Sequence, residues 1–161
     1  MHVLLAALDD ERLQQLSLLL DSALRLVPLD LEVAEVRAPA DLLYRAHLDL
    51  DDVVLLDWSL AEAGSPDLVR ELARINPHLR TIAILPDGAH QRRQRLWEAG
   101  ACSSIPWDRM DPEWLSSALC LVDRAMLWEE RLRESSAATQ RGFTRGTTSS
   151  ASRAAMPSGY G

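Results

Sequence analysis

The segment DDVVLLDWSL, from Asp51 to Leu60, is the clearest indication of the fold in this sequence. Its four apolar residues, 53–56, are bounded by acidic residues before them and by Asp57 and Trp58 after them. A short apolar run with polar ends is typical of a strand buried on both faces, as at the centre of a parallel sheet. Ligands bind at the carboxyl ends of such central strands, so Asp57 is a candidate site residue. The alternative is an acid that caps a helix or faces solvent in a loop.

Short apolar or alternating segments recur along the chain, and each is followed by a segment with helical spacing of its leucines. Five strands alternating with five helices predict an α/β fold. We expect a five-stranded parallel sheet in a three-layer α/β/α sandwich, with the flavodoxin-like strand order and an extended C-terminal helix. The predicted strands are 2–8, 30–37, 53–57, 79–85 and 101–105, and the predicted helices are 11–26, 39–48, 66–76, 89–100 and 111–134.

One globular domain accounts for most of the 161 residues. We assign residues 1–134 to a domain that includes the long last helix, because they hold the predicted strands and the apolar periodicity. Residues 135–161 are rich in Ser, Thr, Gly and Arg and contain few large apolar side chains. Such a segment cannot bury enough apolar surface to offset its loss of conformational entropy, so we predict a disordered tail.

Charge is divided unevenly between the domain and the tail. All 24 acidic residues precede residue 135, together with 14 of the 17 arginines, so the domain carries −10 and the tail +3. An acidic domain repels phosphate backbones, which argues against nucleic acid as a partner. The chain has no lysine, which excludes a P-loop and lysine-based catalysis. Because no segment has the pattern of a signal sequence or a membrane span, we expect a cytoplasmic protein without membrane contact.

An acidic pair, Asp9 and Asp10, follows the first predicted strand. In the predicted topology this strand lies beside the strand that ends at Asp57, so the three carboxylates should meet at one edge of the sheet. Carboxylates in one pocket repel each other unless a cation neutralises them, and an all-oxygen site with room for water suits Mg²⁺. Mg²⁺ is therefore the candidate cofactor. The alternative is that Asp9 and Asp10 only cap the helix that follows them.

These features together resemble the receiver domains of bacterial two-component response regulators. The resemblance covers residues 1–125 and rests on the acidic pair, the DWSL segment after the third strand, the EAGA segment before the fifth strand and the fivefold alternation. In that family the acidic pair binds Mg²⁺, and the aspartate that ends the third strand accepts a phosphoryl group from a histidine kinase. The resemblance implies that Asp57 is the phosphoacceptor and that Asp9 and Asp10 hold Mg²⁺ with it.

Several positions depart from the family in ways that affect this chemistry. The Thr or Ser that ends the fourth strand corresponds to Leu85, which cannot donate a hydrogen bond. The lysine that ends the fifth strand corresponds to Trp107, and Arg109 is the alternative cation. The fifth-strand aromatic that reports activation corresponds to Ser104. Because phosphoryl transfer depends on positive charge near the acceptor, we expect a degenerate, or pseudo-, receiver.

Two surfaces are candidates for protein contacts. Past about residue 125 the last helix is longer than the sheet requires, and Trp128 is the apolar side chain that tests whether the extension binds a partner helix or a second copy. Arg92, Arg93 and Arg95 form a basic cluster on the fourth helix that could dock an acidic partner. The alternative for both is a helix face that only covers the sheet or faces solvent.

Three hypotheses follow. The preferred one is a receiver-like module of a two-component or phosphorelay system that is not an enzyme and acts without phosphorylation, through contacts with a sensor kinase, a signalling protein or a second copy. The second is a working single-domain response regulator, phosphorylated on Asp57 with Mg²⁺ held by Asp9 and Asp10. The third is another flavodoxin-like protein, either a small-molecule binder or an enzyme. The absence of a Gly-rich phosphate loop argues against nucleotide-binding forms of the third.

Overall fold

The computed structural model describes residues 1–60 and 65–146. The chain divides into two compact units, Met1–Val122 and a second one that begins at Asp123. The first unit contains the whole sheet. It ends before the predicted domain boundary at residue 134, because the core against the sheet already closes at Val122.

Five parallel strands form the sheet, in the order β2-β1-β3-β4-β5. This order confirms the predicted flavodoxin-like topology, and β3 lies at the centre with all five of its residues buried. The central strand therefore has the double burial that its apolar run predicted. The strands are β1 His2–Ala6, β2 Glu32–Val36, β3 Val53–Asp57, β4 Arg80–Leu85 and β5 Ser103–Pro106.

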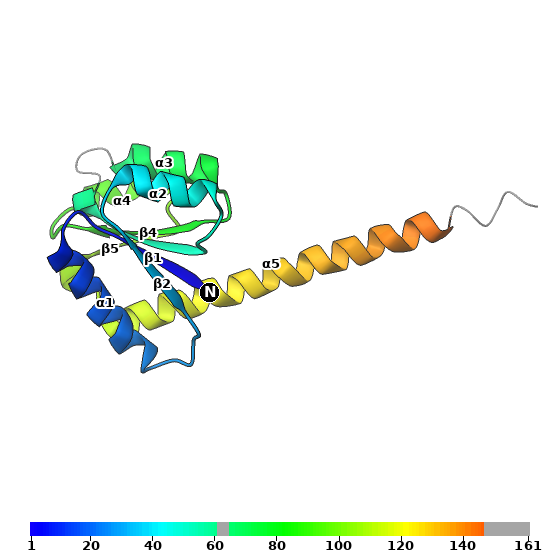
Figure 1. Cartoon of the computed structure of the whole chain (residues 1–161), viewed down its shortest axis with the longest axis horizontal. Helices are drawn as coiled ribbons and strands as arrows, with labels where there is room; N and C mark the ends of the chain where they lie inside the picture. Colours follow the sequence, from blue (N-terminus) through cyan, green and yellow to red (C-terminus); the bar gives the residue numbers. More distant parts are fainter. Residues whose placement is uncertain (61–64, 147–161) are drawn as a thin grey trace, which may run out of the picture. The chain divides into compact units, whose positions relative to one another are not determined.

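Helices cover both faces of this sheet, which gives the three-layer sandwich (Figure 1). On one face α2, α3 and α4 pack against alternate strand residues such as Leu4 and Leu56. On the other face α1 and the first turns of α5 pack against Leu5 and Leu55. Because successive side chains of a strand point to opposite faces of the sheet, each strand contributes to both cores. The helices are α1 Asp10–Leu24, α2 Pro39–His47, α3 Ser65–Ile75, α4 Arg93–Ala99 and α5 Pro112–Gly146.

Short 3-10 turns at the carboxyl end of the sheet position the side chains of the site. The turn η1, Trp58–Leu60, follows β3 directly, and η4, Trp107–Arg109, follows β5 directly. A third turn, η3 at His90–Arg92, precedes α4, so the predicted helix 89–100 begins with a tighter turn. Gly100 ends α4 in the left-handed conformation with φ of 111°, which favours glycine.

The last helix is longer than the sequence predicted. It runs to Gly146, past the predicted end at Glu134, so residues 135–146 are helical rather than part of a disordered tail. Alanine, glutamine and arginine at 137–141 favour helix strongly enough to outweigh the serines beside them. The rest of the predicted tail, 147–161, lies outside the described residues. Among the helices that the structure describes, none is long and apolar enough to cross a membrane.

Candidate functional site

Asp57 is the centre of the candidate site. It ends β3 at the carboxyl edge of the sheet, and its exposed fraction is only 2%. The backbone N–H of Ser59 donates a hydrogen bond to Oδ1 at 2.9 Å, and the indole Nε1–H of Trp107 donates to Oδ2 at 2.8 Å. Each carboxylate oxygen therefore has a donor supplied by the chain itself, as a buried carboxylate requires.

Trp107 is fixed from two sides. Its half-buried ring packs against the core formed by α1, the sheet and α5, and the guanidinium of Arg12 lies over the ring at 4.7 Å from its centroid. This cation–π contact and the core packing hold the indole N–H toward Asp57. Trp107 stands where the resemblance places a lysine. The indole supplies a hydrogen bond there but no positive charge.

The acidic pair after β1 has other partners. Asp9 is the N-cap of α1, and its carboxylate accepts a hydrogen bond from the backbone N–H of Arg12 at 2.8 Å. Asp10 is the first residue of α1, is exposed, and accepts a hydrogen bond from Nε of Arg37 at 2.6 Å. This hydrogen bond raises the pKa of the Arg37 guanidinium. For Asp9, the capping alternative describes the structure.

The expected convergence of three carboxylates is not what the structure shows. Within residues 1–60 and 65–146, no three His, Cys, Asp or Glu side chains are grouped so that they could hold a metal ion. The reason is local: Asp9 caps α1, Asp10 binds Arg37, and Asp57 binds Trp107. This arrangement does not fit Mg²⁺, which requires several oxygen ligands directed at one point. The three carboxylates are thus not grouped in this structure, and Mg²⁺ binding by Asp9, Asp10 and Asp57 stays a prediction.

The other degenerate positions do not supply the positive charge that Trp107 lacks. Leu85, at the end of β4, is fully buried and apolar. Ser104 is buried in β5 and is held by Arg93, whose Nε lies 3.3 Å from Oγ and whose Nη2 lies 3.0 Å from the Ser104 carbonyl oxygen. Arg109 is exposed in η4, and no described interaction joins it to Asp57. The buried side chains around the carboxylate are thus neutral.

The three arginines of the predicted basic cluster lie in different environments. Arg93 binds β5 through Ser104, whereas the guanidinium of Arg92 lies over the ring of Trp58 at 4.6 Å from its centroid. Arg92 and Arg95 line a pocket of about 200 Å³ together with Trp58 and Pro66. We call this the Arg92–Arg95 pocket. The fourth predicted contact residue, Trp128, has an exposed fraction of 61%.

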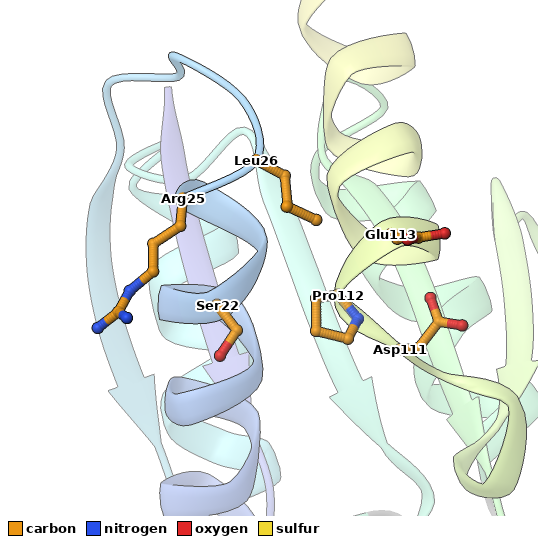
Figure 2. A pocket seen from close by; sticks show the side chains of 6 residues that line it. All are labelled: Ser22, Arg25, Leu26, Asp111, Pro112 and Glu113. Carbon is orange, nitrogen blue, oxygen red and sulfur yellow. The ribbon is translucent and has the colours of Figure 1, made fainter.

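A separate groove lies between the end of α1 and the start of α5 (Figure 2). Its volume is about 540 Å³. Leu26 and Pro112 face each other across it, while Arg25 points away from α5 (Figure 2). The Asp111 carboxylate at its edge caps α5 by accepting the Trp114 N–H at 2.7 Å. None of the side chains that line this groove was predicted as a site residue. They are Ser22, Arg25, Leu26, Asp111, Pro112 and Glu113.

Sequence reasoning placed Trp107 at the lysine position but did not predict the contacts that Trp107 and Trp58 make. Trp58 and Trp107 each follow a strand of the sheet directly, and each contacts a charged side chain. The signal was available for Trp107, because a tryptophan in the core needs an acceptor for its N–H and Asp57 is the buried carboxylate at that edge. No sequence pattern predicted that Arg92 would lie over Trp58 or Arg12 over Trp107.

We predict that replacement of Trp107 with Phe lowers the free energy of unfolding by about 1.5–3 kcal/mol, because the buried Asp57 loses one of its two donors. Trp97→Phe is the matched control, since Trp97 is 63% exposed, and it should change the free energy by less than about 0.5 kcal/mol. Chemical denaturation measures both.

A double-mutant cycle separates the hydrogen bond from ring packing. In an Asp57→Ala background Trp107→Phe should cost at least about 1 kcal/mol less, because the acceptor is already absent. Equal costs in the two backgrounds would contradict the assigned bond.

Comparison with known proteins identifies the fold. No protein-family model and no curated protein sequence matches the chain.

Among solved structures, a protein named for pilus assembly (cpaE) of Burkholderia thailandensis has a TM-score of 0.65 and 22% identity, covering 77% of this chain and 98% of its own. A pilus assembly-related protein of Burkholderia pseudomallei has a TM-score of 0.64 and 23% identity, covering 76% and 88%. A response regulator receiver domain protein of Clostridium thermocellum has a TM-score of 0.63 and 20% identity, covering 81% and 98%. Many of the similar structures are response regulator receiver domains, and this chain has their fold.

Proposed function

We propose that this chain is a cytoplasmic receiver-fold module of a two-component or phosphorelay system, which acts through protein contacts and without phosphorylation of Asp57. The observation that carries the proposal is the 2.8 Å hydrogen bond from Trp107 Nε1 to Asp57 Oδ2. It engages one of the two carboxylate oxygens that could attack phosphorus, and the Ser59 N–H engages the other. The proposed module is not an enzyme.

The chemistry of phosphoryl transfer supports this proposal. Negative charge accumulates on the transferred group, so catalysis depends on cations and donors placed where that charge develops. Around Asp57 the donors are the neutral indole of Trp107 and the backbone N–H of Ser59, and Leu85 offers none. Loss of one such electrostatic contact costs about 2.7–4 kcal/mol, a factor of about 10²–10³ in rate. Loss of two makes phosphorylation too slow to serve as a signal.

The alternative is a working response regulator that is phosphorylated on Asp57 with Mg²⁺ held by Asp9 and Asp10. The position of Asp57 at the end of the central strand favours this alternative. It requires Asp10 to leave Arg37, and it requires the Trp107 indole to leave Asp57. Both steps expose or unpair charged groups, so we prefer the phosphorylation-independent module.

Contacts through α5 are the proposed route of signalling. Leu127, Trp128 and Leu132 are all exposed on this helix, the latter two by about three fifths of their surface. Ala125, Trp128 and Leu132 follow each other at intervals of three and four residues, the spacing of a helix-pairing stripe. A second copy of the chain is the partner proposed for this stripe. Two structures of this fold come from proteins named for pilus assembly, and a role in a protein assembly would agree with pairing through α5.

Intact-protein mass spectrometry tests the phosphorylation-independent function. After incubation with Mg²⁺ and acetyl phosphate, we expect the wild-type chain to carry no phosphoryl adduct, because Asp57 Oδ2 accepts the Trp107 N–H and no cationic side chain among the described residues binds Asp57. Circular dichroism confirms that the sample is folded. An adduct that disappears in Asp57→Asn would overturn the proposal in favour of the working response regulator.

The helix stripe predicts a homodimer. We expect sedimentation equilibrium to show dimers, and the double variant Trp128→Glu, Leu132→Glu to weaken dimerisation by at least about a hundredfold, because four carboxylates would enter an apolar contact. Trp97→Glu, on the equally exposed Trp97 of α4, is the matched control and should leave the dimer intact. A monomeric wild type, or dissociation by the control alone, would contradict dimerisation through this stripe.

A further inference from the structure

The Arg92–Arg95 pocket brings together side chains from four elements of the first unit. Trp58 comes from η1, Pro66 from the first turn of α3, Arg92 from η3 and Arg95 from α4. Trp58 directly follows Asp57, and the next residue, Ser59, donates its N–H to that carboxylate. The hydrogen bonds of the candidate site therefore fix the turn that carries one wall of this pocket.

The two arginines of the pocket differ from the ion-paired arginines of this acidic domain. Arg37, Arg45, Arg70 and Arg74 each form an ion pair with a carboxylate. No ion pair or hydrogen bond with a carboxylate is found for Arg92 or Arg95 in the part of the chain that the structure describes. From residue 88 to residue 97 there are three arginines and no acidic residue, although the domain as a whole carries −10.

The position of Arg92 is set before any ligand arrives. Its guanidinium carbon lies 4.6 Å from the centroid of the Trp58 ring, and this cation–π contact restricts the arginine side chain. A guanidinium that is already ordered loses less side-chain entropy when it binds a carboxylate. Arg93, next in the chain, binds β5 through Ser104 and so anchors the segment that carries both pocket arginines.

The size and lining of the pocket define what fits it. A volume of about 200 Å³ is smaller than the roughly 300–1,000 Å³ of pockets for small-molecule ligands. It accommodates one or two side chains of another protein. Guanidinium groups bind carboxylates through paired hydrogen bonds, and the Trp58 ring with Pro66 offers an apolar wall to the aliphatic stem of glutamate.

We propose that the Arg92–Arg95 pocket binds an acidic segment of a partner protein, with neighbouring glutamate or aspartate side chains paired to its two guanidinium groups. The inference rests on the proposed function and names the chemistry of the partner. Nucleic acid has the required negative charge, but a domain that carries −10 overall repels an extended phosphate backbone, which favours a short acidic segment.

Fluorescence anisotropy with a fluorescein-labelled hexaglutamate peptide tests the inference. We expect the folded full-length chain to bind hexaglutamate and not hexaglutamine. The double variant Arg92→Gln, Arg95→Gln should weaken binding by at least about tenfold, because both charge-assisted pairs are lost. The matched control replaces two exposed arginines of α5, Arg124→Gln and Arg131→Gln, and should change the dissociation constant less than about twofold.

Nuclear magnetic resonance of the indole N–H groups locates the bound peptide. The Trp58 signal, assigned with Trp58→Phe, should shift on addition of hexaglutamate, while the signal of Trp128 should stay unchanged. Absence of binding, equal loss in the control pair, or an unmoved Trp58 signal would overturn the inference. A phosphoryl adduct on Asp57 would overturn the proposed function without altering peptide affinity, so the two failures are distinguishable.

Discussion

The hydrogen bond between the Trp107 indole and Asp57 is the interaction on which the rest of the site depends. A carboxylate with only 2% exposure at the end of the central strand is costly unless each oxygen has a donor. The Ser59 amide satisfies one oxygen and the indole satisfies the other. Once these bonds are made, the carboxylate is stable as part of the folded core without a metal ion and without a cationic side chain beside it.

The side chains around Asp57 are arranged in keeping with its hydrogen bond to Trp107. A bulky ring at the end of β5 needs support, which the core and the Arg12 guanidinium provide. The backbone N–H of that same Arg12 donates a hydrogen bond to the Asp9 carboxylate, which caps α1, so this acid of the pair stabilises the helix that carries Arg12. Neutral donors at a buried acid favour a fixed conformation over a chemical switch, and the proposed function places signalling in the outer surfaces instead.

The fold was predictable because it depends on patterns that a single sequence contains. The apolar run 53–56 indicated a doubly buried strand, and the alternation of strands with helices then left the parallel sheet as the expected arrangement. The positions of Asp57 and Trp107 at one edge followed from topology. Their hydrogen bond could not be predicted from topology, and neither could the pairing of Asp10 with Arg37. Such contacts depend on side-chain rotamers and on the length of the arginine side chain. The predicted end of α5, at residue 134, was wrong. The prediction relied on the serine-rich composition of the segment and gave too little weight to the helix-favouring residues within it.

The most direct measurement of the central claim is the indole signal of Trp107 in solution, followed by nuclear magnetic resonance before and after addition of Mg²⁺ and beryllofluoride. Assignment uses Trp107→Phe. We predict an indole proton that exchanges slowly with solvent and keeps its chemical shift when the phosphoryl mimic is added, because the hydrogen bond to Asp57 is retained. A rapidly exchanging proton, or a large shift that is lost in Asp57→Asn, would show that the indole leaves the carboxylate and that Asp57 remains available as an acceptor.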